Sequence, residues 1–169
     1  DYYELHEQEM IAFEDNLYMF GRLFKEDWLG TPFQFIRSNG SLGGTTVIKN
    51  VETSATMPGN PNNMVRVNDL VYVSTSEQDH QLNYDLKLYR TDGTPEGTFE
   101  IMDTGTSNEM VASGNKLIFA SLDSTGGAGL FASKGTRETT RQLSFVTADR
   151  MPEQLTDVNG IVYFADHYF

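Results

Sequence analysis

The stretch at residues 88–98 constrains the fold of this chain more than any other, because it reads as a strand, a tight polar turn and a second strand. Leu88 and Tyr89 are apolar and suit a half-buried strand. Gly93 accepts a positive φ at little steric cost, and Asp92 can hydrogen-bond to the backbone two residues further on. The stretch therefore predicts a β-hairpin.

Two further copies of this pattern occur, at residues 35–45 and 130–140. Each copy keeps an apolar pair, two spacers, a polar residue, a glycine, a Ser or Thr, and then a Thr four residues after that. We expect a structural turn in every copy, because the glycine and its polar neighbours are typical turn residues. The predicted turn residues are Asn39, Gly40, Asp92, Gly93, Thr94, Gly97, Thr98, Gly135 and Thr136.

A second element alternates with these copies. It is a two-residue turn of Asp, Asn or Gly followed by a strand with an aromatic residue near its end, and the turns fall at positions 15, 68, 114 and 159. Asn-Gly between apolar runs is the strongest short hairpin signal. Two alternating hairpins give four strands per unit, and a period of about 40 to 50 residues with four strands is typical of propeller blades. The predicted fold class is all-β, with β-propeller blades of four antiparallel strands.

The chain holds about three and a half such repeats, whereas a closed propeller has about 4 to 8 blades. We therefore expect one partial propeller domain, an arc of a larger propeller, rather than an arc completed by a half-blade from elsewhere. Within it, residues 52–63 are expected to connect blades and residues 74–85 to form a long polar insertion. The predicted divisions are 1–9 (a linker or the end of a preceding blade), 10–51 (blade 1), 52–103 (blade 2), 104–145 (blade 3) and 146–169 (a half blade with the inner hairpin only).

The repeated motif resembles the bacterial ELWxxDGT repeat family, whose consensus is Glu-Leu-Trp, two variable positions, Asp-Gly-Thr, two more, and Gly-Thr. The second unit matches best, with Lys87-Leu88-Tyr89, Asp92-Gly93-Thr94 and Gly97-Thr98. Ile36, Tyr89 and Phe131 stand at the tryptophan position. The resemblance implies β-propeller-like domains of secreted or surface proteins in bacteria, often exported by type IX secretion. It implies no enzymatic activity and no agreed ligand.

Charge narrows the range of partners. Lys and Arg number 12 against 24 Asp and Glu, for a net charge of −12, and such a chain repels nucleic-acid phosphates. No apolar run approaches the roughly 18 to 20 residues of a membrane span. Cysteine is absent, which excludes disulfides and thiolate chemistry. The chain begins Asp1-Tyr2-Tyr3-Glu4 without a signal peptide, and we expect a mature product or a fragment of a longer chain or larger complex.

Candidate binding residues lie in the predicted loops, where function on a rigid scaffold tends to sit. They are Trp28, Asp79, His80 and Tyr84. Trp28 is either a lid on the core or an exposed platform for a ligand. The sequence contains neither a nucleophile-elbow motif nor a phosphate-binding loop, and the spacing of the three histidines does not suit zinc. No catalytic residue and no metal site is predicted.

Calcium is the one cofactor with a candidate position. Asp92, Thr94 and Glu96 offer oxygens in one short loop, but calcium needs six to eight of them. The other copies carry Asn39 and Lys134 in place of Asp92. A purely structural turn without a cofactor is therefore the favoured interpretation, and calcium is the alternative.

The leading hypothesis is a non-enzymatic propeller segment of a secreted bacterial cell-surface protein, which binds a protein or glycan in adhesion or assembly. Its expected location is extracellular or at the cell surface, with the periplasm as the alternative. A second hypothesis is an enzyme on a propeller scaffold that acts on glycans. A third is a cargo or accessory subunit of a bacterial secretion or surface complex of the type IX kind.

Overall fold

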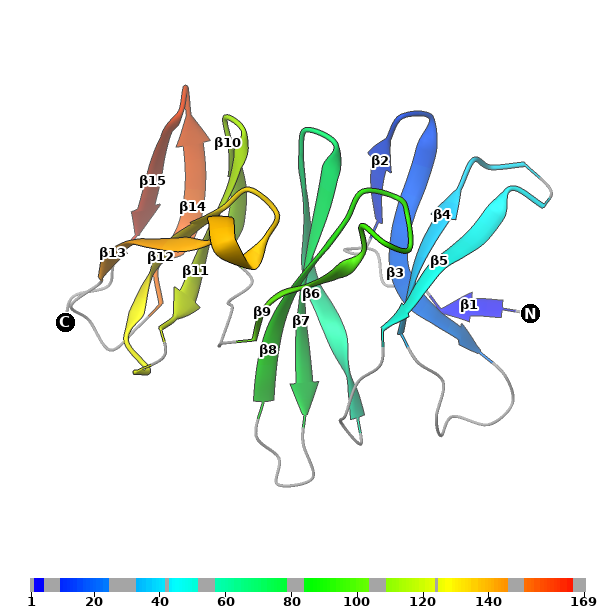
Figure 1. Ribbon diagram of the computed structural model, residues 1–169, viewed down its shortest axis with the longest axis horizontal. Coiled ribbons are helices and arrows are strands. Elements are labelled where there is room, and N and C mark those ends of the chain that lie inside the picture. The colour runs from blue at the N-terminus through cyan, green and yellow to red at the C-terminus, as the bar shows by residue number, and fades with distance from the viewer. Residues whose placement is uncertain are drawn as a thin grey trace.

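The protein is built from β-sheets that lie side by side in chain order, as the computed structural model shows (Figure 1). The all-β, antiparallel, repeated architecture predicted from the sequence is confirmed, and the row of sheets is not closed on itself. In the described part of the chain the helical structure is one 3₁₀ turn, η1 (Arg137–Thr139). The structure describes residues 2–4, 10–24, 33–41, 43–51, 57–78, 84–103, 109–123, 125–145 and 151–165.

The first sheet is centred on one long strand that pairs with two others on the same side. The first half of β3 pairs with β2, and its second half pairs with β1, which residues 2–4 form before the first repeat. β4 and β5 then complete the sheet by antiparallel pairing. Its strands are β1 (Tyr2–Glu4), β2 (Met10–Phe13), β3 (Asn16–Phe24), β4 (Phe33–Ser38) and β5 (Thr45–Val51).

The second and third sheets have four strands each in simple chain order, and the fourth is a two-stranded hairpin. The second sheet has β6 (Met57–Val67), β7 (Leu70–Gln78), β8 (Tyr84–Thr91) and β9 (Phe99–Asp103). The third has β10 (Met110–Ser113), β11 (Lys116–Leu122), β12 (Ala128–Ser133) and β13 (Arg141–Phe145). The fourth has β14 (Glu153–Val158) and β15 (Ile161–Ala165).

The two-residue turns that open each sheet are confirmed. Asn68, Gly114 and Asn159 each have a positive φ in the turn, as short hairpin turns require. The first turn begins one residue earlier than predicted, at Glu14, with φ of 45° at Glu14 and 56° at Asp15. The Asn, Asp and Gly residues at these positions, unlike Glu14, reduce the cost of the left-handed conformation.

Two predicted loops are largely strand. β6 begins at Met57, inside the expected connection at 52–63, and its register shifts on either side of Asn60 and Pro61. Proline is compatible with a strand at such irregularities and on a sheet edge, which is where β6 lies. The prediction of a polar loop at 74–85 is also wrong in part, because β7 continues to Gln78 and β8 starts at Tyr84.

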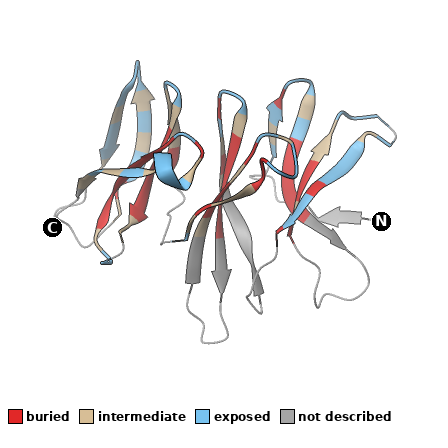
Figure 2. Ribbon diagram, viewed as in Figure 1, coloured by how far each residue is buried: buried red, intermediate tan, exposed pale blue. Residues whose placement is uncertain are grey.

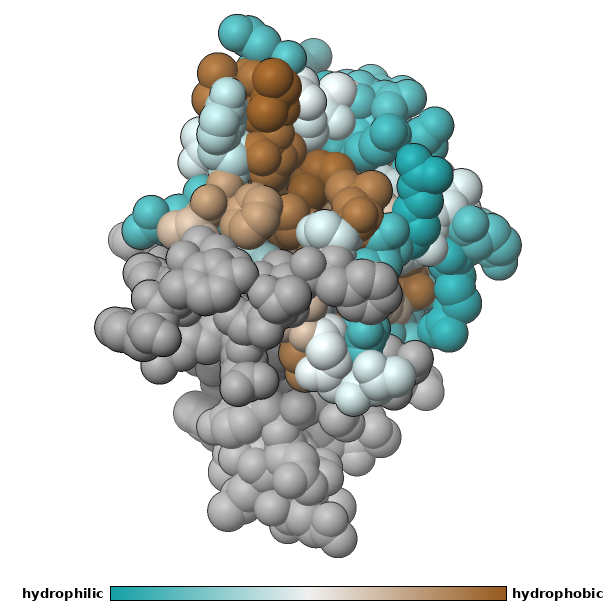
Figure 3. All heavy atoms as spheres, turned by 90° about the vertical axis from the view of Figure 1, so that its left-hand side faces the viewer, coloured by the Kyte–Doolittle hydropathy of each residue, from teal (hydrophilic) through white to brown (hydrophobic). Residues whose placement is uncertain are grey.

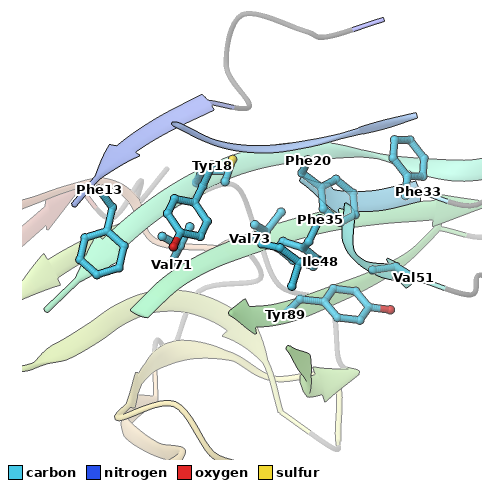
Figure 4. Close-up of a cluster of buried hydrophobic side chains, with 11 residues drawn as sticks. Phe13, Tyr18, Phe20, Phe33, Phe35, Ile48, Val51, Val71, Val73 and Tyr89 are labelled. Carbon is cyan, nitrogen blue, oxygen red and sulfur yellow. The ribbon is translucent and has the colours of Figure 1, made fainter. Parts of the chain in front are cut away.

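The core lies between the sheets, and buried residues line their central strands (Figure 2). Alternate residues of a central strand pack against opposite neighbours. In β7, Val71 and Val73 pack against the first sheet, whereas Tyr72 packs against the third. Figure 4 shows the first of these clusters, in which the Phe35 ring stands edge-on to Phe20 at 4.7 Å. Each central sheet is thus buried on both faces, and it is stable only between its neighbours.

The contact between sheets repeats along the chain. We call the face of a sheet that meets the following sheet its trailing face, and the face that meets the preceding sheet its leading face. The trailing faces carry Phe13 and Tyr18 in the first sheet, and Val67, Leu70 and Tyr72 in the second. The leading faces carry Met64 and Val71 in the second sheet, Met110 and Leu117 in the third, and Leu155 and Val162 in the fourth.

The motif glycines of the second and third sheets, Gly93 and Gly135, also meet the trailing face of the sheet before them. A Cβ at Gly93 would lie 2.6 Å from the Tyr18 hydroxyl, and a Cβ at Gly135 would lie 2.6 Å from Leu70 Cδ1 and 3.3 Å from the Tyr72 hydroxyl. Both glycines have positive φ, of 89° and 102°. The motif glycine is therefore required twice, for the turn itself and for the close approach of the neighbouring sheet.

Replacing Gly93 by alanine tests that second requirement. Gly126 is the matched control, because its φ of 85° is nearly the same and an added Cβ there has open space among the described residues. We expect Gly126→Ala to cost about 1 kcal/mol for the left-handed backbone alone. Gly93→Ala should cost about 1–3 kcal/mol more, because buried Tyr18 must shift. Urea unfolding of both variants measures the difference, and equal losses would contradict the packing role.

Tyr72 makes the second interface sensitive to alkaline pH. Burial raises the pKa of its phenol to about 12, although the Arg90 guanidinium opposes the shift. Its hydroxyl is buried and has no hydrogen-bond partner in the described structure. Because the folded pKa exceeds the ordinary value of 10.0, the stability linked to the neutral phenol is complete below pH 10 and is lost as the pH rises from 10 towards 12.

We expect Tyr72→Phe to change the free energy of unfolding at pH 7 by less than about 1 kcal/mol, since the lost hydroxyl has no partner. Between pH 9.5 and pH 11.5, the stability of the variant should fall less than that of the wild type, by on the order of 1–2 kcal/mol. Urea titrations at both pH values measure this. Tyr163→Phe, at an exposed tyrosine, is the control and should follow the wild-type profile.

Candidate functional site

The motif turn of the second sheet is closed by hydrogen bonds among its own short side chains. Asp92 Oδ1 accepts from the Thr94 backbone N–H at 2.9 Å and from the Thr94 hydroxyl at 2.7 Å. Thr94 Oγ1 in turn accepts from the Gly97 N–H at 3.0 Å. Arg90 donates from Nε to the Gly97 carbonyl at 3.1 Å and stacks its guanidinium over the Phe99 ring at 4.4 Å. The turn is thus a rigid, internally bonded unit.

A pair of hydroxyl groups joins the two strands at the base of every motif turn. Thr91 Oγ1 lies 2.7 Å from Thr98 Oγ1, and both side chains are buried. The same pair occurs in the first copy as Ser38 with Thr45 at 2.8 Å, and in the third as Ser133 with Thr140 at 2.8 Å. The first hydroxyl of each pair also accepts from the N–H of the motif glycine, at 3.2, 3.0 and 3.1 Å in chain order.

The sequence prediction missed one half of this pair. It included the second hydroxyl of the second copy, Thr98, but passed over Ser38, Thr91 and Ser133. The available signal was a Ser or Thr two residues before the motif glycine in all three copies. Such a residue is easily assigned to generic turn composition, because its partner lies seven residues away across the hairpin.

The polar residue before the glycine is the variable part of the turn. Asn39 reproduces the aspartate contacts, with its Oδ1 accepting from the Ser41 N–H at 3.0 Å and the Ser41 hydroxyl at 2.7 Å. Burial acts to raise the pKa of the Asp92 carboxyl, but the hydrogen bonds from Thr94 and the charge of Arg90 outweigh it and lower that pKa. In the third copy, where Lys134 stands, Thr136 instead caps η1 by accepting from the Thr139 N–H at 3.3 Å.

The buried hydroxyl pair gives a direct test of the turn. Thr91→Val leaves the Gly93 N–H and the Thr98 hydroxyl without their shared partner in a buried place, and it should cost about 1–3 kcal/mol of unfolding free energy. Thr91→Ser keeps the hydroxyl and should restore most of that loss. Ser38→Ala is the matched change in the more exposed first copy and should cost less than Thr91→Val. An equal cost at Ser38 and Thr91 would show that burial does not strengthen the pair.

The strands that lead into the connections predicted to bind a ligand end at the opposite edge of the array. β3 ends at Phe24 and β7 ends at Gln78, and equivalent strands run the same way, so both connections leave the array at one edge (Figure 1). Trp28, Asp79 and His80 lie outside the described residues. Tyr84 is the first residue of β8 and pairs with Gln78 across the hairpin, but its side chain is not described. Asp79 directly follows the last paired residue.

The connection of the third sheet at this edge is a compact turn built on one carboxylate. Asp123 Oδ1 accepts from the Thr125 N–H at 2.8 Å, the Thr125 hydroxyl at 2.7 Å and the Gly127 N–H at 2.9 Å. These hydrogen bonds, with that from the Thr125 hydroxyl first, lower the pKa of the Asp123 carboxyl. The oxygen is fully used inside its own turn, so this connection is structural.

A shallow hollow of about 500 Å³ opens at the motif-turn edge of the first sheet. Its lining includes Ser38, Asn39 and Gly40 from the motif turn, Leu17 from β3, and Arg66 from β6. Arg66 is held in place, with Nε donating to the Asn68 carbonyl at 2.8 Å and its guanidinium 4.2 Å from the centre of the Phe13 ring. None of its described lining residues is one of the predicted binding residues.

Among the residues that the structure describes, no three His, Asp or Glu side chains are grouped so that they could hold a metal ion. Calcium at the Asp92 turn therefore stays a prediction. In the described part of the chain, no helix is long and apolar enough to cross a membrane.

Neither protein-family models nor curated proteins give a match to this sequence. Among solved structures, the fold is similar to Zg3597, a family 117 glycoside hydrolase produced by the marine bacterium Zobellia galactanivorans, at 10% sequence identity and a TM-score of 0.43. The similarity covers 80% of this chain and 44% of that protein, so the chain spans less than half the length of the structure it matches.

This comparison corrects one expectation. The sequence predicted a chain without enzymatic activity, whereas the similar structure is that of a glycoside hydrolase. We therefore do not retain the prediction that the chain is not an enzyme. At this TM-score, the similarity assigns no activity or substrate in its place.

Proposed function

We propose that this chain is an arc of β-propeller blades from a secreted bacterial surface protein, and that it binds a protein or glycan at the edge carrying residues 25–32 and 79–83. A glycan is the ligand we would test first. Neutral sugars suit a chain of net charge −12, which repels acidic polymers. The candidate contact residues are Trp28, Asp79, His80 and Tyr84.

The β7–β8 hairpin is the observation that most supports this proposal. Its ladder runs through eight residue pairs, from Val71 opposite Thr91 to Gln78 opposite Tyr84. The equivalent ladder between β11 and β12 has six pairs, and that between β3 and β4 has five. Two extra pairs carry the paired end of the second hairpin about 7 Å beyond that of the third, at about 3.3 Å per residue. Residues 79–83 therefore follow a hairpin extended beyond that of the third sheet, and residues 25–32 follow β3, which has nine residues like β7.

The propeller interpretation draws support from the order of the strands. The first strand of each sheet contacts the first strand of the next, from β2 to β6, β6 to β10 and β10 to β14. The remaining strands then follow in chain order away from this line. Propeller blades are arranged in this way, with their first strands lining the central axis. Secretion and assembly through a type IX pathway belong to the same proposal and rest on the repeat motif alone.

An array of immobilised neutral oligosaccharides, probed with the labelled protein, tests the proposed edge. We expect selective retention of a subset of the glycans, and a loss of affinity of about tenfold or more in Trp28→Ala and in the double variant Asp79→Ala, His80→Ala. Incubation with the retained sugars and measurement of new reducing ends distinguishes binding from cleavage.

Lys134→Ala is the control, because Lys134 is exposed in a motif turn at the opposite edge. It should bind like the wild type. If retention is unchanged in the Trp28 and Asp79–His80 variants, the ligand binds elsewhere and the proposed edge is wrong. If no oligosaccharide is retained, the glycan part of the proposal fails, and capture of protein ligands must be tested with the same variants.

A further inference from the structure

The chain contains two Asn-Gly dipeptides, and both lie in exposed turns. Asn39-Gly40 belongs to the motif turn of the first sheet, and Asn159-Gly160 is the two-residue turn between β14 and β15. The side-chain amide carbon of an asparagine is open to attack by the next backbone nitrogen when glycine follows, because glycine has no side chain to hinder the approach. The two turns hold these reacting groups in different ways.

In the turn at Asn159, the attacking nitrogen is hydrogen-bonded to a carboxylate. The Gly160 N–H donates to Asp157 Oδ1 at 3.3 Å. The other oxygen of this carboxylate, Oδ2, is buried and has no hydrogen-bond partner in the described structure. A carboxylate in this position is a general base, since it takes up the amide proton as the nitrogen forms its new bond.

The Asn159 side chain is free to move towards that nitrogen. It is exposed, and no hydrogen bond to a described residue holds its amide group. The β14–β15 turn is the highest point of Figure 1, and Figure 3, which faces this end of the array, shows hydrophilic surface at its highest point. Water therefore reaches the amide carbon, and the ammonia that the reaction releases can leave.

The Asn39 amide is held in place instead. Its Oδ1 accepts from the Ser41 N–H at 3.0 Å and from the Ser41 hydroxyl at 2.7 Å. The amide also packs on the backbone of Gly44, where an added Cβ would overlap Asn39 Oδ1. The Gly40 N–H donates to a neutral hydroxyl, that of Ser38, at 3.2 Å. Attack on the Asn39 amide therefore requires that the bonds to Ser41 break first.

We propose that Asn159 is a site of spontaneous deamidation, with Asp157 as the general base and water as the co-reactant. The Gly160 nitrogen forms a bond to Cγ of Asn159 while its proton passes to Asp157. The bond from Cγ to the amide nitrogen then breaks, and this nitrogen takes the proton from Asp157 and leaves as ammonia. Water hydrolyses the resulting cyclic imide at either carbonyl, which gives aspartate or isoaspartate. This inference does not depend on the proposed ligand.

The modification changes the hairpin in two ways. Either product adds a negative charge at the turn. Isoaspartate also routes the backbone through the former side chain, which adds a methylene group between Val158 and Ile161, the pair that flanks the turn. Leu155 of β14 and Val162 of β15 pack against the third sheet. The reaction therefore lengthens a turn whose two strands hold the fourth sheet to the third.

Peptide mapping by mass spectrometry tests the proposal, with the folded protein incubated at neutral pH in water that carries heavy oxygen. Incorporation of the label reports hydrolysis of the imide, and electron-transfer fragmentation distinguishes isoaspartate from aspartate. We expect Asn159 to deamidate about tenfold faster than Asn39 in the same sample, because general bases contribute factors of this order or more. In urea, which removes both turns, the two rates should become similar.

Asp157→Asn isolates the role of the base, because an amide oxygen still accepts from the Gly160 N–H but does not take up its proton. The rate at Asn159 should fall about tenfold in the folded variant and should match that of the wild type in urea. Asn39 is the control within the same molecule. Its rate should be the same in the variant and the wild type, and a rise would reveal unfolding.

Three outcomes would overturn the proposal. Equal rates at Asn159 and Asn39 in the folded wild type would mean that the two turns do not differ in reactivity. A difference that persists unchanged in urea would assign it to local sequence instead of the folded turn. A wild-type rate at Asn159 in Asp157→Asn, with Asn39 still slow, would exclude the carboxylate as the base.

Discussion

The packing of one sheet on the next is the interaction on which the rest of this structure depends. An isolated sheet here would expose apolar side chains on both faces, as the alternation of Val71, Tyr72 and Val73 shows. Burial of both faces is the main stabilising term that such a stack can supply. The motif glycines belong to the same interaction, since they let a turn approach the aromatic side chain of the preceding sheet. The motif glycine and the apolar core therefore serve the same contact between sheets, although they are separate in the sequence.

The motif turn has a constant part, the hydroxyl pair, and a variable part, the residue before the glycine. The hydroxyl pair at its base is the same in three copies, whereas the residue before the glycine is Asn39, Asp92 or Lys134. An amide or a carboxylate there closes the turn by accepting two hydrogen bonds, and the third copy closes its turn with a 3₁₀ segment instead. The geometry of the turn thus depends more on the hydroxyl pair at the strand ends than on the residue before the glycine.

The sequence predicted the hairpins well because their signals are local. Asn, Asp and Gly at positive φ mark the turns, and period-two apolar patterns mark the strands between them. It failed where strands are polar, as in the extension of β7 through Gln78, or contain proline, as in β6, because backbone pairing there is not reflected in side-chain pattern. The site could be predicted only as a set of loops. Which connections leave the array at the same edge depends on how the sheets are arranged, and local sequence signals do not show that arrangement.

Two sites where a side chain of one sheet bonds to the next share a further feature. Lys49 of the first sheet donates to the backbone carbonyl of Thr98 at 2.6 Å and to that of Pro95 at 3.3 Å. Glu109, before the third sheet, accepts from the backbone N–H of Leu155 at 3.0 Å. In both, one partner is main chain and has no side-chain identity to preserve. At these two sites the main-chain partner can change its side chain without losing the hydrogen bond, whereas the Arg137–Glu100 ion pair between the third and second sheets, at 3.6 Å, depends on both side chains.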